Sequence, residues 1–305
     1  MTEPQAAPRG VYAANLTPYD ADGAPDRARF VGHAKWLLAN GCDGVAPLGT
    51  TGEANSLSVD ERLGLIAALG EAGITGARLI VGIGCTAIPD TVRLAKAALA
   101  IGAGGCLMLP PFYYKGASED GLFAAFAETI ERTGDERLRL YLYHIPQMSG
   151  VPLPLPLIER LVKAYPRIVV GMKDSSGDWE NMRTTLSAIP GFQLFPGTEE
   201  FLLAGLRHGG VGCISATTNV TCAQAQRVYA GWQGGEADAL QAHLTALRKS
   251  FDGLPAIPVL KAYLARARGD AAWRRVRPPF LAASEASLAT LDGRFAAASF
   301  SLAAE

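Results

Sequence analysis

The chain has 305 residues, 49% of them hydrophobic, and a formal net charge of −1 at pH 7. That length suits one large α/β barrel or two small domains, and a core of such size needs no disulfide bonds. The near-neutral charge argues against nucleic acid as a main partner, because phosphate-binding surfaces carry a basic excess.

Cysteine usage and the N-terminal residues predict a soluble, cytoplasmic protein. The 5 cysteines are scattered and odd in number, and none forms a C-x-x-C pair, which is typical of free thiols in a reducing compartment. The opening MTEPQAAPRG lacks the apolar segment of a secretory signal. No uncharged apolar stretch reaches about 18 residues, so we expect no membrane span.

Eight short apolar segments follow one another along the chain, and each is expected to form a strand. They lie at residues 10–17, 44–49, 78–84, 105–110, 139–145, 167–173, 192–197 and 210–215. Their residues are continuously apolar rather than alternating, as in parallel strands that are covered on both faces.

Amphipathic segments with helix start and stop signals separate these strands. One spans residues 26–40, and the next opens with Ser58, which has Glu61 three residues later as in a capping box. A third carries Pro89 in its first turn. A fourth begins after Ser118 and stops at Gly134. The pattern is therefore strand then helix, repeated.

This alternation predicts a (β/α)8 TIM barrel with extra C-terminal helices. A doubly wound open sheet is the competing architecture, but no G-x-G-x-x-G turn follows the first strand. We expect residues 1–221 to supply the barrel strands and helices. Residues 222–305 would form the eighth barrel helix and a helical extension in the same compact unit.

In such a barrel the active site lies at the C-terminal ends of the strands, and the sixth expected strand ends in Lys173. Partial desolvation there disfavours an ammonium ion, and a neutral amine can form a Schiff base with a ketone. The alternatives are an ion pair with Asp174 or a side chain that reaches solvent. Both remain open from position alone.

Hydroxyl groups end two further strands. Tyr143 ends the fifth strand and could relay protons, although an ordinary strand-end tyrosine is as consistent with the sequence. Thr50 and Thr51 lie in a glycine-bounded loop that could hold a carboxylate, or could be only a turn. The histidines show no H-x-H or H-E-x-x-H spacing, so we predict no metal site.

Six segments, taken in order, resemble the dihydrodipicolinate synthase / N-acetylneuraminate lyase family of class I aldolases. They are GVYAANLTPYD, GTTGEANSLSVDER, PPFYYK, YHIPQMSG, GMKDSSGD and AIPVLKAYL, and they cover nearly the whole chain. Each is weak alone, but together they coincide with the expected strand ends. The resemblance implies a cofactor-free enzyme whose only covalent intermediate is an imine on its lysine.

The resemblance also implies roles for matching positions. Lys173 would form the imine with pyruvate or another 2-keto acid, and Tyr143 would be the acid/base. Thr50 and Thr51 would hold the substrate carboxylate and relay protons. Tyr113 would be a second catalytic tyrosine, which in the family often reaches a neighbouring subunit. The family is commonly a tetramer of two tight dimers, so a homotetramer is implied.

Further positions would bind substrate in such an enzyme. Ile214 would present its backbone near pyruvate, and Gly197, Ser175 and Met148 would also bind substrate. GTEE, which contains Glu199 and Glu200, resembles a lyase segment whose acidic groups meet the hydroxyls of a sugar-derived chain. As residues of a helix N-terminus, both glutamates would equally complement the helix dipole.

Two positions depart from the synthases of the family. Those enzymes have an arginine that binds the carboxylate of aspartate semialdehyde where this chain has Met148, and a thioether cannot replace a bidentate guanidinium. His144 replaces the usual asparagine, and the sequence gives no physical reason for it.

The sequence therefore predicts a lyase that cleaves or forms a C–C bond next to a pyruvate imine. The expected substrate is a 2-keto-3-deoxy sugar acid or a related hydroxylated 2-keto acid. A dihydrodipicolinate synthase with an altered carboxylate site and a keto-deoxy acid dehydratase are the alternatives. A barrel that only binds a keto acid is the rival from another class.

Overall fold

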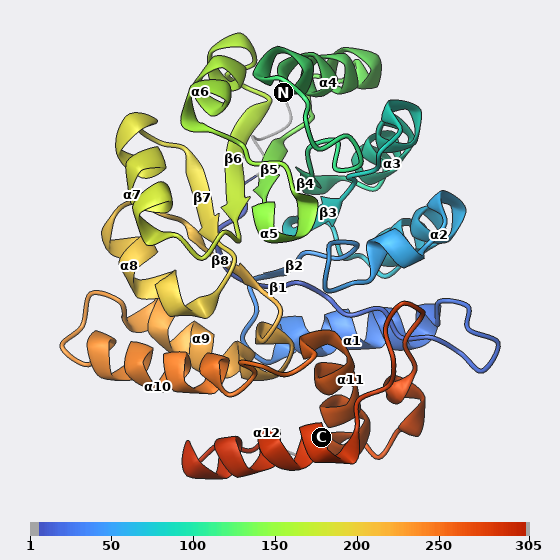
Figure 1. Ribbon diagram of the computed structural model, residues 1–305, viewed down its shortest axis with the longest axis vertical. Helices are drawn as coiled ribbons and strands as arrows, with labels where there is room; N and C mark the ends of the chain where they lie inside the picture. The colour runs from blue at the N-terminus through green and yellow to red at the C-terminus, as the bar shows by residue number, and fades with distance from the viewer. Residues whose placement is uncertain (1–5, 303–305) are drawn as a thin grey trace.

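The computed structural model, which describes residues 6–302, confirms the predicted (β/α)8 barrel (Figure 1). Its 8 strands are parallel neighbours in the order β7-β6-β5-β4-β3-β2-β1-β8. The Val211 N–H donates to the Leu194 carbonyl at 3.1 Å, which joins the two ends of this order. The strands are β1 (Gly10–Ala13), β2 (Gly44–Val45), β3 (Gly76–Gly82), β4 (Ala103–Met108), β5 (Leu140–His144), β6 (Val169–Asp174), β7 (Gln193–Pro196) and β8 (Gly212–Ser215).

Helices surround the strands, and three more helices lie on the side of α1 and α9 (Figure 1). The surrounding helices are α1 (Arg27–Ala39), α2 (Val59–Glu71), α3 (Ile88–Ala100), α4 (Glu119–Thr133), α6 (Leu155–Ala164), α7 (Trp179–Ala188), α8 (Leu202–Arg207) and α9 (Thr218–Gly231). The extension contains α10 (Ala237–Lys249), α11 (Ala256–Ala267) and α12 (Glu285–Ala297). Short helices are α5 (Pro146–Ser149), η1 (Ala54–Ser56), η2 (Glu199–Phe201) and η3 (Ala271–Arg274).

The predicted start and stop signals act as expected. Ser58 and Glu61 form a reciprocal capping box at the start of α2. The Ser118 hydroxyl accepts the Gly121 N–H at 3.2 Å at the start of α4. Gly134 ends that helix in the left-handed conformation, with φ 65°. Local sequence and global fold therefore agree along this part of the chain.

The extension packs directly onto the barrel. The boundary that the sequence suggested after residue 221 falls inside α9. A second apolar cluster joins Leu16 and Val220 of the barrel with Leu260 and Leu264 of α11 and Leu291 of α12. The C-terminal helices thus share a core with the barrel, and no described helix is long and apolar enough to cross a membrane.

Aromatic rings fill the interior of the barrel below the strand ends that carry the candidate site. The Phe195 ring packs edge-on against Tyr12 and Tyr141, with centroids 5.5 and 5.8 Å away. The Tyr12 hydroxyl donates to the Ala77 carbonyl, and the Tyr141 hydroxyl donates to the Gln193 side chain at 2.5 Å. Both partners lie near strand starts, so the rings form a plug towards the N-terminal end.

Candidate active site

A cavity of about 350 Å³ opens at the C-terminal ends of the strands. Its walls include Thr50, Thr51, Tyr143, Lys173, Ser175 and Gly197. These side chains come from segments far apart in the sequence, and the barrel brings them together because parallel strands all end at one rim. The cavity is much larger than the three-carbon pyruvyl unit needs, so it has room for an extended chain.

Lys173 points into this cavity from β6 and is only 4% exposed. Its Nζ donates to the Tyr143 hydroxyl at 3.2 Å and lies 4.4 Å from the centre of the same ring. The two residues are register partners on β5 and β6. Asp174 does not take the amine as a partner: its carboxylate accepts the Asn181 amide at 2.6 Å and the Ser176 N–H at 2.8 Å.

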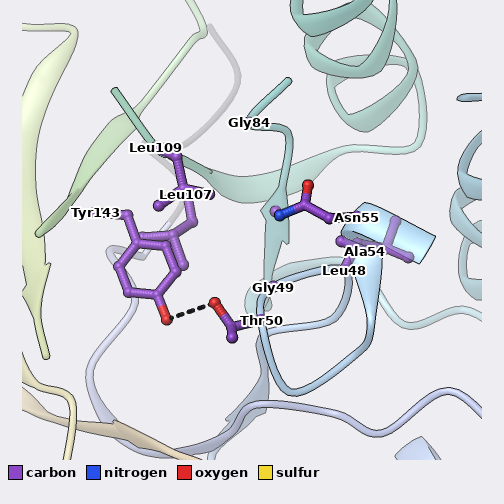
Figure 2. Close-up of a pocket in the computed structure, with 10 residues that line it drawn as sticks. Leu48, Gly49, Thr50, Ala54, Asn55, Gly84, Leu107, Leu109 and Tyr143 are labelled. Atoms are coloured by element: carbon purple, nitrogen blue, oxygen red, sulfur yellow. Dashed lines mark hydrogen bonds between the residues drawn. The ribbon is translucent and has the colours of Figure 1, made fainter. Parts of the chain in front are cut away.

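Tyr143 is buried between an amine and a hydroxyl. Burial alone would raise the pKa of its phenol, but the charge of Lys173 and hydrogen bonds from Thr50, Lys173 and Ser175 outweigh burial and lower that pKa. The Thr50 and Tyr143 hydroxyls are 3.2 Å apart (Figure 2). A phenol with a lowered pKa in contact with an amine and a hydroxyl can exchange protons with either one.

Behind this hydroxyl pair, a small cavity separates the Tyr143 ring from η1. Figure 2 shows Thr50 facing Tyr143, with Leu107 and Leu109 beside the ring and Asn55 on the opposite side. The enclosed space is about 10 Å³, which is the size of a single water molecule. The hydroxyl pair is therefore closely packed on the side away from the larger cavity.

Glu53 anchors the loop that carries Thr50 and Thr51. Glu53 has the left-handed φ of 54° and is ion-paired with Lys261 of α11, and both side chains are completely buried. Its second oxygen accepts the Arg277 N–H at 3.1 Å. Burial lowers the pKa of Lys261 to about 8, although the Glu53 carboxylate stabilises the ammonium form and so acts to raise this pKa. The extension thereby holds the loop that presents the threonine hydroxyls.

Gly197 and Ser175 both line the cavity and lie in direct contact. A Cβ on Gly197 would be 1.9 Å from the Ser175 Oγ and 2.7 Å from its Cα. The Ser175 N–H donates to the His144 carbonyl at 2.7 Å, which fixes its backbone. Only glycine fits at this position, since the serine cannot retreat without losing its contacts.

The two neighbouring glutamates separate in the structure. Glu199 is fully buried away from the cavity, where its carboxylate accepts the hydroxyls of Ser215, Thr217 (2.7 and 2.6 Å) and Thr221 (2.8 Å). Glu200 lines the cavity instead. The sequence suggested both residues for substrate hydroxyls, but the geometry offers only the Glu200 carboxylate, since that of Glu199 already accepts from three hydroxyls.

Three further predicted site residues do not line this cavity. Ile214 is fully buried in the barrel interior, with its backbone paired to Tyr12 of β1. Met148 on α5 is 60% exposed. Tyr113 is 73% exposed and packs edge-on against Tyr114 in the loop after β4. A single chain therefore does not bring Tyr113 to Lys173.

His144 has a structural partner that the sequence could not reveal. Its Nδ1 accepts the Leu153 N–H at 3.1 Å, and the ring is almost completely buried. Burial lowers its pKa, against the opposing effect of Asp174 and Asp178. The neutral ring therefore carries its proton on Nε2 and fixes the chain segment that follows α5.

Sequence reasoning missed several residues of the cavity. Gln147 lines the cavity and donates to the Ser175 carbonyl at 2.5 Å. Arg248 enters from α10, outside the barrel helices. Gln147 follows the end of β5 and could have been found because active-site residues lie at strand ends, whereas no local pattern marks Arg248. Among residues 6–302, no group of three or more His, Cys, Asp or Glu could hold a metal ion.

A comparison with known families assigns the chain. The model of the dihydrodipicolinate synthetase family matches residues 7–297. The chain belongs to this family. This family contains lyases of the class I aldolase type, and the chain is an enzyme of that class.

Individual members of the dihydrodipicolinate synthetase family resemble the whole chain. An uncharacterized DapA-like lyase of Chloroflexus aurantiacus is 35% identical over 296 residues, or 95% of this chain and 97% of the relative. A 4-hydroxy-tetrahydrodipicolinate synthase of Rhizobium meliloti is 34% identical and covers 92% and 95%. The crystal structure of dihydrodipicolinate synthase from Agrobacterium tumefaciens superposes with a TM-score of 0.87 at 32% identity, covering 94% and 98%.

Proposed function

We propose that this enzyme forms an imine between Lys173 and the ketone of a hydroxylated 2-keto acid, and cleaves or forms the adjacent C–C bond. The contact between the Lys173 Nζ and the Tyr143 hydroxyl, 3.2 Å inside a cavity of about 350 Å³, carries this proposal. A buried amine next to a phenol of lowered pKa is the arrangement that imine chemistry requires.

Imine formation follows from this contact. The Tyr143 oxygen, as the phenolate, takes a proton from the Lys173 ammonium, and the lone pair of the resulting neutral amine attacks C2 of the keto acid. The carbinolamine oxygen then receives protons through Tyr143 and Thr50 and leaves as water. The resulting imine carries a positive charge on nitrogen, which makes it an electron sink for carbon chemistry at C3.

Cleavage uses the same proton path in the opposite sense. The Tyr143 oxygen removes the proton of the substrate hydroxyl at C4, the C3–C4 bond breaks, and its electron pair moves into the imine as an enamine. The aldehyde fragment departs, the enamine is protonated at C3, and water releases pyruvate from Lys173. Condensation is the reverse of these steps.

The remaining walls suit a hydroxylated chain. Thr50 and Thr51 offer hydroxyl and backbone N–H groups to the carboxylate at C1, and Ser175 and Gly197 lie beside the same end. Glu200 lines the same cavity with a side chain that is 26% exposed, and it can accept hydrogen bonds from chain hydroxyls. A 2-keto-3-deoxy sugar acid has a carboxylate, a ketone and hydroxyls in this order.

Condensation of pyruvate with aspartate semialdehyde is the second candidate, because relatives at about 34% identity are named as synthases. Met148 argues against it, since its side chain is exposed and uncharged. If Met148 sets acceptor choice, Met148→Arg will add condensation activity with aspartate semialdehyde, and an unchanged variant would refute that role. Loss of water from a keto-deoxy acid uses the same imine, so product analysis separates a dehydratase.

We also propose that the enzyme assembles as a homotetramer of two dimers, with Tyr113 reaching the site of a neighbouring subunit. The exposed Tyr113 and Tyr114 rings support an interface at this loop, since large apolar side chains are rarely left in solvent in pairs. Sedimentation of the wild type and of Tyr113→Ala tests the assembly, and a monomeric wild type would refute it.

Borohydride trapping tests the function itself. Reduction in the presence of pyruvate should attach a stable adduct to the peptide that contains Lys173, as read by mass spectrometry. Lys173→Ala should show no adduct, while Lys35→Ala, which removes an exposed lysine of α1, should trap as the wild type does. Absence of an adduct on Lys173 in the wild type would overturn the proposal.

A further inference from the structure

Two cationic side chains line the cavity in the described part of the chain, and only one of them is used by the imine chemistry. Lys173 lies at the buried end, whereas Arg248 comes from the last turn of α10 and its side chain is 28% exposed. The guanidinium therefore lies near the opening. A substrate bound through its ketone at Lys173 would extend towards it.

The position of Arg248 is set by packing of α10 on the barrel. Gln241 of the same helix donates to the Glu199 carbonyl at 2.9 Å and accepts the Leu203 N–H at 3.0 Å. These contacts hold α10 against η2 and the start of α8. The packing of α10 thereby fixes the position of Arg248 in the wall of the cavity.

Most of the hydrogen-bonding capacity of Arg248 is available to a ligand. Its Nη1 donates to Asp252 at 3.1 Å, four residues later on an exposed surface. Such a pair contributes little, and a guanidinium has five N–H donors in a planar fork. The free edge can bind a carboxylate through two parallel hydrogen bonds.

The surrounding charges favour a ligand with a single negative charge. Glu200 lines the same cavity and is 3.8 Å from Lys249, and Asp252 contacts the guanidinium itself. These two carboxylates would repel a dianionic phosphate ester more strongly than a carboxylate. Met148 is uncharged, so it does not offset the repulsion between these carboxylates and a dianion.

We propose that Arg248 binds a second carboxylate at the far end of the substrate, so that the enzyme prefers 2-keto diacids over 2-keto acids with a neutral end. This inference rests on the proposed imine chemistry and assigns its substrate class. Arg248 acts on specificity: it contacts the end of the chain and takes no part in bond cleavage.

The test measures borohydride trapping, which requires imine formation but no turnover. Four six-carbon 2-keto acids are compared that differ only at C6, which is a methyl, a hydroxymethyl, a carboxylate or a phosphate ester. In the wild type, half-maximal trapping should need about tenfold less of the diacid than of the hydroxymethyl acid. Arg248→Met should remove this difference between the diacid and the hydroxymethyl acid.

Two further variants make the result specific. Arg248→Lys keeps the charge without the fork, and should keep only part of the preference. Arg207→Met removes an arginine of α8 that is paired with Asp238 of α10 outside the cavity, and this variant should trap all four acids as the wild type does. Melting curves establish that each variant is folded.

The outcomes separate this inference from the function on which it rests. Equal trapping of the diacid and the neutral-ended acids by the wild type would overturn it, as would a preference that survives in Arg248→Met. Tighter trapping of the phosphate ester than of the diacid would overturn the assignment to a carboxylate. A protein that traps pyruvate but shows any of these results keeps its proposed function, whereas one that traps no keto acid loses both.

Discussion

Replacing Lys261 by methionine should destabilise the enzyme strongly, because it removes the direct ion-pair partner of the buried Glu53 carboxylate. Both side chains are fully buried, and the Lys261 Nζ also lies 4.3 Å from the centre of the Tyr19 ring. After the substitution, Glu53 keeps the Arg277 N–H at 3.1 Å and the more distant attraction of the Arg277 guanidinium. Methionine has similar length, so the change removes the charge with little loss of packing.

The size of the effect follows from the cost of an uncompensated buried charge, which is about 3–5 kcal/mol. An unfolding entropy of about 2.1 cal/mol/K per residue amounts to about 0.6 kcal/mol/K for this chain of 305 residues. The Lys261→Met variant should therefore melt about 5–8 °C below the wild type. The threonine loop should also lose its anchor, so imine trapping should weaken at temperatures where the fold persists.

A double-mutant cycle measured by thermal and urea unfolding checks the reasoning. Adding Glu53→Gln to Lys261→Met removes the stranded charge and should recover part of the lost stability. Arg207→Met, which breaks an exposed pair with Asp238, should cost less than about 1 kcal/mol. If Lys261→Met is no worse than this surface control, or the two buried substitutions simply add, the buried-charge argument is refuted.

Three other variants probe the site and the core. Tyr143→Phe should lower kcat by about 10²- to 10⁴-fold in a pyruvate-release assay, and a smaller loss would remove it as the acid/base. Gly197→Ala should raise KM for keto acids because its Cβ would be 1.9 Å from the Ser175 Oγ, while Gly32→Ala, which meets nothing within 4 Å, should not. Burial lowers the pKa of His33 to about 3 in the folded protein, compared with about 6.5 in the unfolded chain. Below pH 6.5 the unfolded chain therefore binds this proton more readily, and lowering the pH favours unfolding. Between pH 6 and pH 4, unfolding free energy should fall about 1.4 kcal/mol per pH unit more steeply than in His33→Gln, and equal slopes would contradict this.

The strand ends were predictable because parallel-barrel strands carry a continuous apolar signal. That signal identified all eight strands, and with the rim rule it led to Lys173 and Tyr143. Lys173 was recognisable because a lysine is seldom left at the end of an apolar run without a partner. The capping residues were equally local, so Ser58 and Ser118 could be recognised from spacing alone.

The rest depended on contacts between distant segments. GTEE does not reveal which glutamate faces the cavity. A single turn of η2 sends Glu199 towards the hydroxyls of Ser215, Thr217 and Thr221, and Glu200 towards the cavity. Arg248 reaches the rim only through the packing of α10, and His144 depends on a backbone N–H nine residues later. The predicted cytoplasmic location and the absence of a nucleic-acid partner stay predictions.

The packed rings of Tyr12, Tyr141 and Phe195 fill the barrel towards its N-terminal end, so ligands reach Lys173 from the C-terminal ends of the strands. In the proposed reaction, pyruvate is bonded to Lys173 at the closed end of the cavity, so the aldehyde would have to leave before pyruvate does. Pyruvate would therefore bind first in synthesis and be released last in cleavage. In product-inhibition kinetics, pyruvate should compete with the substrate of cleavage, whereas the aldehyde should not. A random order of product release would contradict access from one end of the barrel.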